Sequence, residues 1–503
     1  MSTIRRQSIL SSVVVYFGFA LGFFNTYLLT REGGFTQEQY GLMGLFISLG
    51  NIMFAVSSMG MQSYIYKFYP YYKDRLKPSE NDMMTWSLLI SVIGFIFVMI
   101  GGFVFKDLVI QKYSTNSPDL VTYYIWVFPL GFGLTIFSIL EAFAWQLRKS
   151  VLTNFLREFL FRFFTTVLIV LASWGVIKNF DLFIKVFALL YLGLVLILGV
   201  YLYWIGQLRF TFKVSKVSRR FYDKIVALAL FIWSGNLIFT ISNQFDTLVI
   251  GAAMDKGIGF VAIYTLAQNI ASLIQAPQRG IISSSVAALS EAWKNKDKEK
   301  IQRIYHRSSI NQIIFASGMF VLIWLNFTDG VYTFHLQKNY LAAMEVFLFI
   351  GMMRLIDMGT GVNAQIIGTS TFWRFDFITG IILLAITLPF NYLLTKKLGV
   401  TGPAIANLAA LTIYNLIRFL YLYRKMGLQP FNWKSLYTLL LALAGFLICY
   451  SLFNDKQGFG WIVCRSLLFL LLFIPGLILL KVSPDIVPVW NTVLKKLRIK
   501  NKE

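Results

Sequence analysis

The sequence contains few charged residues, and this scarcity excludes most soluble proteins. Asp, Glu, Lys and Arg make up 14% of the 503 residues, hydrophobic residues make up 57%, and the mean hydropathy is +0.66. An ordinary soluble domain has about a quarter charged residues. No stretch is long and polar enough to fold as a separate soluble domain. We therefore expect a protein that works inside or across a membrane.

Cysteine, histidine and the common nucleotide-binding motifs are also scarce or absent. The two cysteines, Cys449 and Cys464, lie in apolar segments and have neither disulfide nor metal-site spacing. His306 and His335 are predicted at opposite membrane faces and cannot share a metal. The sequence has no Gly-Lys pair, hence no Walker motif, and no Gly-x-Ser-x-Gly elbow. We predict no cofactor, no metal and no enzymatic reaction.

Long apolar runs make up most of the sequence. About fourteen segments approach the ~20 residues that span a bilayer as a helix. Typical runs are Ile9–Leu29, Met83–Phe105, Leu182–Ile205, Leu436–Phe453 and Trp461–Leu480. They are continuously apolar rather than alternating, which favours helices over a β-barrel. The predicted fold class is therefore an all-α integral membrane protein with about fourteen transmembrane helices.

The net charge of +23 could indicate a nucleic-acid-binding protein, so its placement matters. Most Lys and Arg residues lie in alternate loops and at the two termini; residues 209–220 and 294–303 are two such basic stretches. Alternating positive loops follow the positive-inside rule and place both termini in the cytoplasm. We expect contacts with anionic membrane lipids and no nucleic acid.

Polar side chains within the apolar segments are the candidate site residues, because such groups are costly in lipid and normally face a cavity or another helix. The eighth segment carries a stripe on one helical face, with Pro277 predicted to kink it. The seventh and tenth segments carry further polar residues, and isolated arginines occur in the fifth, eleventh and twelfth. The candidates are Tyr264, Gln268, Gln275, Arg279, Asn243, Asp246, Arg354, Asp357, Arg162, Arg374 and Arg418.

Each candidate also has a structural interpretation. The amides can form ordinary hydrogen bonds between helices. Arg354 and Asp357 are spaced as an i, i+3 ion pair. The three isolated arginines lie near segment ends and can extend to the membrane surface. Asp246 and Arg279 are the stronger site candidates, since each lies on a helix with several other polar residues.

Three sequence stretches resemble bacterial polysaccharide flippases of the O-antigen and capsule type. These belong to the multidrug/oligosaccharidyl-lipid/polysaccharide exporter superfamily. The stretches are residues 243–251 with 261–267, residues 391–394 with 399–406, and residues 39–41 with 66–70. Ala262 stands where a glycine is common. The resemblance covers nearly the whole chain through helix order and loop length.

The resemblance implies two six-helix lobes around a central cavity, at 1–224 and 225–425. It adds two extra helices at 426–481, and a basic amphipathic cytoplasmic tail follows at 482–503. The implied function is alternating-access transport of an undecaprenyl-diphosphate-linked oligosaccharide across the bacterial cytoplasmic membrane. Such a transporter serves cell-surface polysaccharide synthesis, including lipopolysaccharide or exopolysaccharide, and works beside a polysaccharide polymerase and export machinery.

The resemblance also assigns roles to the candidates. Arginines 279, 354, 162, 374 and 418 would attract the diphosphate. Tyr264, Gln268, Gln275 and Asn243 would contact the sugars, and Asp246 and Asp357 would serve ion coupling. Two alternatives remain: an ion-coupled multidrug exporter of the same superfamily, and a membrane polymerase or ligase for lipid-linked glycans. The fourteen-segment count argues against the exporter, and the short outer loops argue against the enzyme.

Overall fold

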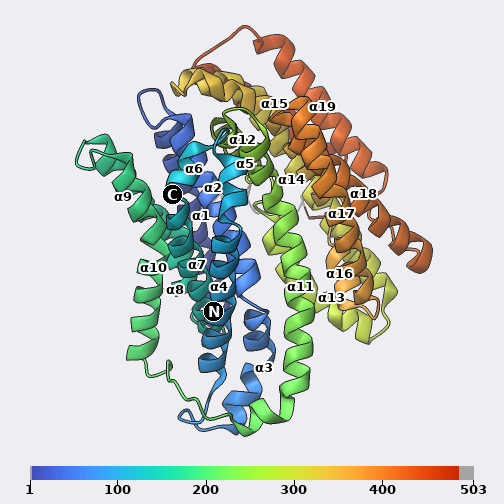
Figure 1. The fold of residues 1–503 in the computed structure, drawn as a ribbon. Coiled ribbons are helices and arrows are strands. Elements are labelled where there is room, and N and C mark those ends of the chain that lie inside the picture. Colours follow the sequence, from blue (N-terminus) through green and yellow to red (C-terminus); the bar gives the residue numbers. More distant parts are fainter. Residues whose placement is uncertain (1–2, 486–503) are drawn as a thin grey trace, which may run out of the picture. The chain divides into compact units, whose positions relative to one another are not determined.

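All regular structure in the described part of the chain, residues 3–485, is helical, and that part contains no β-strand (Figure 1). The structure is a computed structural model. It confirms the predicted all-α class. Backbone contacts divide the chain into two compact units, Met1–Ala262 and Ile263–Glu503. The predicted domain boundaries, and a cavity between the lobes, stay predictions. The predicted amphipathic tail falls mainly on residues 486–503, which lie outside the described part.

The first unit is built around α7, which is buried over most of its length. It contacts α2, α3, α4 and α10, as expected for a predominantly apolar helix. The helices of this unit are α1 (Thr3–Thr30), α2 (Gln37–Ser57), α3 (Met61–Arg75), α4 (Met83–Val104), α5 (Lys106–Tyr113), α6 (Pro118–Thr122), η1 (Tyr124–Trp126), α7 (Val127–Gln146), α8 (Ser150–Asn154), η2 (Phe155–Leu160), α9 (Phe161–Ser173), α10 (Phe180–Trp204) and α11 (Lys216–Ala253); α12 (Gly257–Ala271) contains the boundary between the units.

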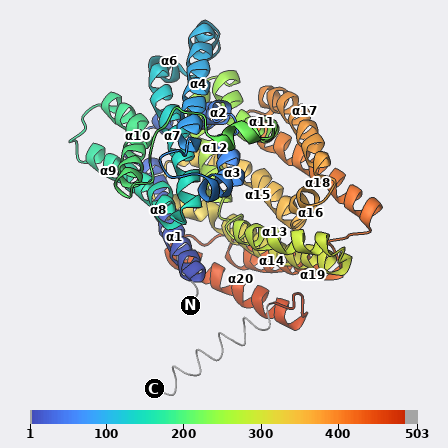
Figure 2. The same cartoon turned by 90° about the horizontal axis from the view of Figure 1, so that it is seen from below.

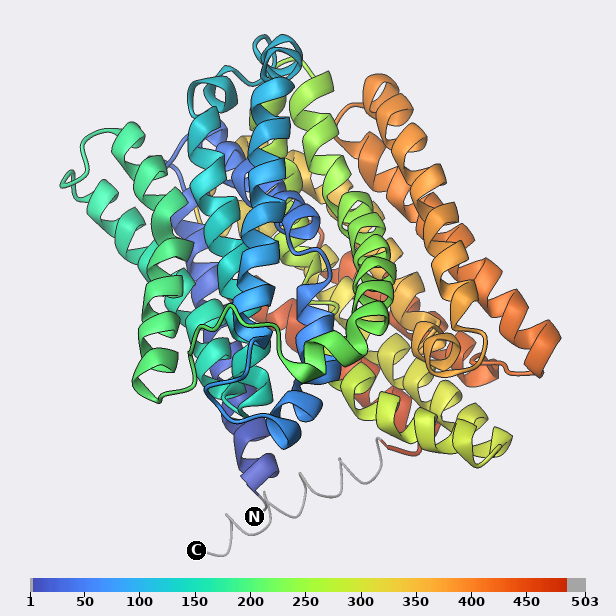
Figure 3. The same ribbon diagram turned by 60° about the horizontal axis from the view of Figure 1, so that its bottom comes forward.

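The second unit packs its helices in neighbouring pairs. Contacts join α17 with α18, α15 with α18, and α14 with both α19 and α20; the α17–α18 pair and the long α14 are seen in Figures 2 and 3. Its helices are α13 (Gln278–Lys294), α14 (Lys298–Thr333), η3 (Lys338–Ala342), α15 (Ala343–Gly359), α16 (Asn363–Thr369), α17 (Trp373–Leu398), α18 (Thr401–Met426), α19 (Trp433–Phe453) and α20 (Phe459–Leu479).

Side chains at the helix starts explain where several helices begin. Thr36 and Gln39 form a capping box at α2, with the Thr36 Oγ1 atom accepting from Gln39 N at 3.3 Å. Ser215 caps α11 and Asp297 caps α14 in the same way. These oxygens satisfy amide groups that a helix start leaves unpaired. Local sequence therefore fixes these boundaries before any tertiary contact forms.

Ten helices in the described residues are long and apolar enough to cross a membrane, and the shorter apolar stretches Val14–Thr30 and Gly257–Ala271 accompany them. Many large hydrophobic side chains on these helices are exposed, for example Leu196, Leu440 and Leu471. Exposure on this scale suits contact with lipid rather than water. The chain is therefore a multi-pass membrane protein, and the count of fourteen segments stays a prediction.

Three of the helical segments are interrupted. The α2–α3 segment breaks at residues 58–60, the α12–α13 segment at 272–277, and the α15–α16 segment at 360–362. Gly60 and Gly361 adopt positive φ angles of 75° and 61° at two of these breaks. Pro277 ends the break that precedes α13, which confirms the predicted interruption there. Interrupted helices in transporters commonly lie near the transported ligand.

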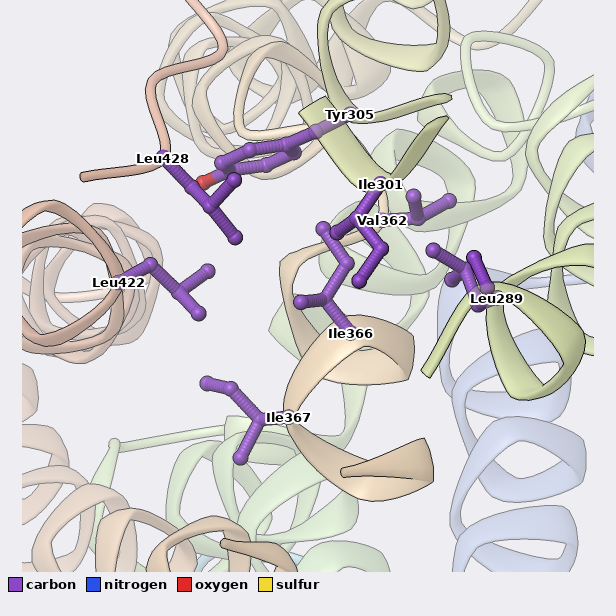
Figure 4. Close-up of a cluster of buried hydrophobic side chains, with 9 residues drawn as sticks. Leu289, Ile301, Tyr305, Val362, Ile366, Ile367, Leu422 and Leu428 are labelled. Atoms are coloured by element: carbon purple, nitrogen blue, oxygen red, sulfur yellow. The ribbon is translucent and has the colours of Figure 1, made fainter. Parts of the chain in front are cut away.

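A cluster of buried hydrophobic side chains packs together in the second unit (Figure 4). Leu289 from α13, Tyr305 from α14, Ile366 from α16 and Leu422 from α18 converge there. The Trp293 Nε1 atom donates to the Ile366 carbonyl at 3.1 Å beside the cluster. This hydrogen bond and the apolar contacts hold the short α16, which follows the 360–362 break, against α13.

Candidate functional site

A polar stripe runs along α18 of the second unit. Asn407, Asn415 and Arg418 are spaced by eight and three residues, which places them on one face of the helix. All three contact neighbouring helices: Asn407 contacts α12 and α17, Asn415 contacts α15 and α16, and Arg418 contacts α17. The stripe therefore lies inside the unit rather than toward lipid.

Asp357 on α15 is held by amides from two other helices. Its Oδ2 atom accepts from Gln278 Nε2 at 3.0 Å, and its Oδ1 atom accepts from Asn415 Nδ2 at 3.3 Å. The Asn415 Oδ1 atom in turn accepts from Thr360 Oγ1 at 3.1 Å and from Asn363 Nδ2 at 2.9 Å. Thr360 begins the 360–362 break and Asn363 directly follows it. The arrangement places a carboxylate beside an interrupted helix, where neutral amides are its hydrogen-bond donors.

Arg418 is buried, with 3% of its side chain exposed, and its guanidinium is fully engaged. It forms an ion pair with Asp376 of α17, and its Nε atom donates to Thr379 Oγ1 at 3.2 Å. The guanidinium also lies over the Tyr414 ring, 3.9 Å from the ring centroid. Arg418 therefore does not extend to the membrane surface. The Asp376 side chain is 43% exposed, so the carboxylate is the accessible member of the pair.

A second hydrogen-bonded chain links α17, α18 and α12. Asn391 Nδ2 donates to Asn407 Oδ1 at 3.2 Å, and Asn407 Nδ2 donates to Tyr264 Oη at 3.3 Å. Tyr264 and Asn391 are both fully buried. Tyr264 therefore supports the stripe from within the packed unit.

The other predicted residues of the second unit are more scattered. Arg354 is half-buried one turn before Asp357 on α15, and Gln268 is half-buried near the end of α12. Gln275 lies within the 272–277 break, and its backbone carbonyl accepts from Gln278 N at 3.0 Å. Arg374 is exposed in the first turn of α17. The side chain of Arg279 lies outside the described part, although its backbone begins α13.

The three predicted residues of the first unit lie on two separate helices. Arg162 on α9 pairs with Glu158 at 3.0 Å and stacks over the Phe19 ring at 5.2 Å. On α11, Asn243 is exposed and donates to the Phe239 carbonyl of its own helix at 2.7 Å, whereas Asp246 is buried. Arg162 thus lies on α9, whereas Asn243 and Asp246 lie one turn apart on α11.

A buried ion pair in the first unit escaped the sequence reasoning. Arg157 Nη1 lies 2.6 Å from Glu141 Oε2, and only 3% of the Glu141 side chain is exposed. Arg157 lies in the π-helical turn η2, where a π-turn often marks a functional position. The α1 helix approaches this turn so closely that a Cβ added at Gly18 would lie 2.3 Å from the Glu158 carbonyl oxygen.

The missed signal was local. Arg157 and Glu158 stand together at the start of an apolar run, and this position reads as a loop edge. Glu158 and Arg162 are spaced i, i+4, which favours a helical pair inside the run instead. The charges at 157, 158 and 162, taken with Glu141, would have indicated a charged layer in the first lobe.

A second missed group fastens the last two helices. Arg465 of α20 is 5% exposed and donates to the carbonyls of Leu325 at 2.6 Å, Phe453 at 3.2 Å and Lys456 at 2.9 Å. Its Nη2 atom lies 3.7 Å from Asp329 Oδ2 on α14. The arginine therefore joins the α19–α20 connection to α14.

The architecture defines a class of protein: a multi-pass, all-helical membrane protein with interrupted helices and buried charged residues. Solved structures with this fold include the lipid II flippase MurJ in an inward closed conformation, with a TM-score of 0.73, 15% identity, and coverage of 93% of this chain and 98% of that chain. A multidrug resistance MATE family transporter of the MOP superfamily, inward-facing, matches with a TM-score of 0.59, 16% identity, and coverage of 83% and 94%. A MATE transporter in the straight conformation matches with a TM-score of 0.54, 17% identity, and coverage of 84% and 95%.

The family model described as "Polysaccharide biosynthesis protein" matches residues 4–293, which is more than half of the chain. The chain belongs to this family. No curated protein matches it. The structural likenesses, at 15–17% identity, show the fold. The predicted recognition as a member of the flippase and exporter superfamily is confirmed.

Proposed function

We propose that the protein is a flippase that moves an undecaprenyl-diphosphate-linked oligosaccharide across the bacterial cytoplasmic membrane, by alternating access, for cell-surface polysaccharide synthesis. Membership of the polysaccharide biosynthesis family supports a saccharide-bearing substrate. The carrying observation is the buried polar stripe of α18, which keeps Asp357 and Arg418 inside an apolar fold. Ionisable groups at such positions normally belong to a transport pathway.

The share of this chain that each solved structure covers supports a flippase over a drug exporter. The lipid II flippase fold extends over 93% of this chain, whereas the MATE folds extend over 83–84%. The described chain also continues past α18 with α19 and α20. An apolar hairpin of this kind suits a substrate whose lipid tail stays in the bilayer. No covalent reaction is needed, because transport only exchanges the solvation of the diphosphate and sugars.

The site residues keep the roles proposed from the sequence. Arginines would attract the diphosphate, since a guanidinium matches phosphate geometry with two hydrogen bonds. The hydrogen bonds around Asp357 suit a coupling role, because protonation or cation binding there would alter contacts with α13 and α18 together. Polysaccharide polymerase and export machinery are the proposed partners on the receiving side.

Transport of a labelled polyprenyl-diphosphate oligosaccharide in liposomes tests the proposal. Protein-dependent loss of label from one leaflet is expected, under a proton or sodium gradient. Absence of transport under every gradient tried would overturn the flippase assignment. Transport of a cationic dye with no transport of the labelled oligosaccharide would instead establish the exporter.

Two substitutions test the residues. Arg279→Ala should lower transport while membrane insertion stays intact. Asp357→Asn keeps the side-chain shape and an acceptor for Asn415, so we expect transport to fall about tenfold or more with little change in thermal stability. Lys185→Gln, which removes an exposed i, i+4 pair with Asp181, is the matched control and should transport normally. Normal transport in either test variant would remove that residue from the site.

A further inference from the structure

An apolar groove of about 670 Å³ lies within the first unit. Its walls come from the α2–α3 break, from α4 and from the first four turns of α11. The lining is almost wholly apolar, with Ile90, Val226 and Leu230 along its length. One charged residue, Arg219, stands at the end where α11 begins.

Hydrogen bonds hold the open end of the groove in a fixed shape. Asp82 is fully buried, and its Oδ2 atom accepts from Ser215 N at 2.8 Å, from Ser218 Oγ at 2.8 Å and from Trp86 Nε1 at 3.2 Å. Tyr72 Oη lies 2.6 Å from Ser218 Oγ and thereby adds α3 to the network. The start of α11 is thus tied to both α3 and α4, and the groove exists before any ligand binds.

The inner end is closed by backbone. Gly60 lies so close to α11 that an added Cβ would be 2.3 Å from the Ala229 carbonyl oxygen. Trp233 Nε1 donates to the carbonyls of Ala55 at 2.9 Å and Val56 at 3.1 Å, which the break in α2 leaves without helical partners. The groove therefore has a charged residue where α11 begins, apolar walls, and closely packed backbone near Ala229.

The length of the groove matches one leaflet. Eleven residues separate Arg219 from Leu230 on α11, which corresponds to about 16 Å of helix. Half of the ~30 Å hydrocarbon thickness of a bilayer is about 15 Å. Arg219 lies within the basic stretch at 209–220 and takes part in none of the ion pairs found among the described residues.

We propose that this groove binds an anionic membrane lipid, with the phosphate at Arg219 and one acyl chain between α4 and α11. Charge complementarity selects the headgroup, because a guanidinium pairs with phosphate through two hydrogen bonds. The apolar wall is about as long as one leaflet is thick, which suits an acyl chain. The lipid would pack against the α2–α3 break and so stabilise one arrangement of that interrupted helix. This proposal does not depend on the proposed transport function.

Native mass spectrometry of the full-length protein with phosphatidylglycerol or phosphatidylcholine tests the site. We expect tighter binding of phosphatidylglycerol, and Arg219→Glu should weaken it about tenfold or more, since the reversal changes the local attraction by two unit charges. Arg220→Glu is the matched control: it reverses the neighbouring charge, which does not line the groove, and should change binding less than twofold.

Val226→Trp, at a position that is 37% exposed, should fill the groove and weaken binding of both lipids. Leu230→Trp, also an exposed position, gives a second filling variant if the first does not fold. Equal losses in the Arg219 and Arg220 variants, unchanged binding in a folded filling variant, or equal binding of the two lipids would overturn the proposal. Displacement of phosphatidylglycerol by equimolar polyprenyl phosphate would reassign the groove to the transported lipid and overturn it as well.

Discussion

Buried charges in this protein are paired or hydrogen-bonded, and their partners explain why an apolar fold tolerates them. Glu141 pairs with Arg157, Arg418 with Asp376, and Arg465 with Asp329 and several carbonyls. A buried pair adds little net stability over an apolar replacement, but loss of one member leaves an uncompensated charge. The pairs should therefore respond very differently to single and double substitution.

Glu141→Leu should destabilise the protein by about 2 kcal/mol or more, because Arg157 would keep its charge without its partner. The double variant Glu141→Leu with Arg157→Met should recover most of that loss. The measurement is thermal unfolding of the purified protein in detergent. Lys185→Gln breaks an exposed pair and should cost less than about 1 kcal/mol. A double variant as unstable as the single one would show that the pair itself stabilises the fold.

At the scale of the elements, the interruptions are built features with their own contacts. The α2–α3 break combines positive φ angles at Met59 and Gly60 with the Trp233 hydrogen bonds to freed carbonyls. At the α15–α16 break, the side chains of Thr360, which begins the break, and of Asn363, which follows it, both donate to Asn415. A neighbouring helix thus holds each break, and at the first break it satisfies backbone carbonyls that a continuous helix would satisfy itself.

Gly60→Ala should destabilise the first unit by about 3 kcal/mol or more, because the new methyl group would meet the Ala229 carbonyl and the positive φ disfavours alanine. Gly206 has a similar φ of 69° but open space around it, so Gly206→Ala isolates the conformational cost at about 1 kcal/mol. Thermal unfolding of both variants gives the comparison. Equal losses would mean that the contact with α11 is unimportant.

The α19–α20 hairpin should depend on Arg465. Arg465→Met would leave Asp329 and three carbonyls without this donor, and we expect a loss of about 3 kcal/mol with faster proteolysis at the α19–α20 connection. Cys464→Ser is the control, because it changes the neighbouring residue at an exposed position and leaves Arg465 in place. Unchanged protease resistance in the Arg465 variant would show that apolar packing alone holds the hairpin.

At the scale of the whole molecule, the charge pattern makes a prediction about orientation. The basic stretches alternate along the chain, and from this pattern we predict that both termini face the cytoplasm. Green fluorescent protein fused after Glu503 should fluoresce, and alkaline phosphatase fused there should be inactive. Phosphatase inserted at residues 31–36 or 454–458 should be active. Active phosphatase at the C-terminus would contradict the proposed topology.

Much of the fold was accessible from the sequence because lipid imposes a strong constraint on it. Apolar runs of spanning length have one stable solution, a helix that satisfies its own backbone, and α4, α10 and α19 follow directly from Met83–Phe105, Leu182–Ile205 and the run after Leu436. Pro277 likewise marked its break. The break at residues 58–60 carried no proline, and it became visible only through contacts with α11.

The site was less accessible, because a polar residue in an apolar run shows only its own helical face. The sequence singled out Asp357 and Arg418, but their partners Gln278, Asn415 and Asp376 come from other helices. Arg157 was overlooked because its partner Glu141 lies on a different segment.

The sequence by itself determined the class of structure, since hydropathy and the cost of unpaired backbone in lipid depend on local composition. It also determined the family through short stretches of side chains. Only the tertiary structure decided which buried charges neutralise one another and where helices are broken, because these depend on distances between residues far apart in the chain. The lipid groove beside Arg219 belongs to this second group: no single segment contains it, and packing of α3, α4 and α11 creates it.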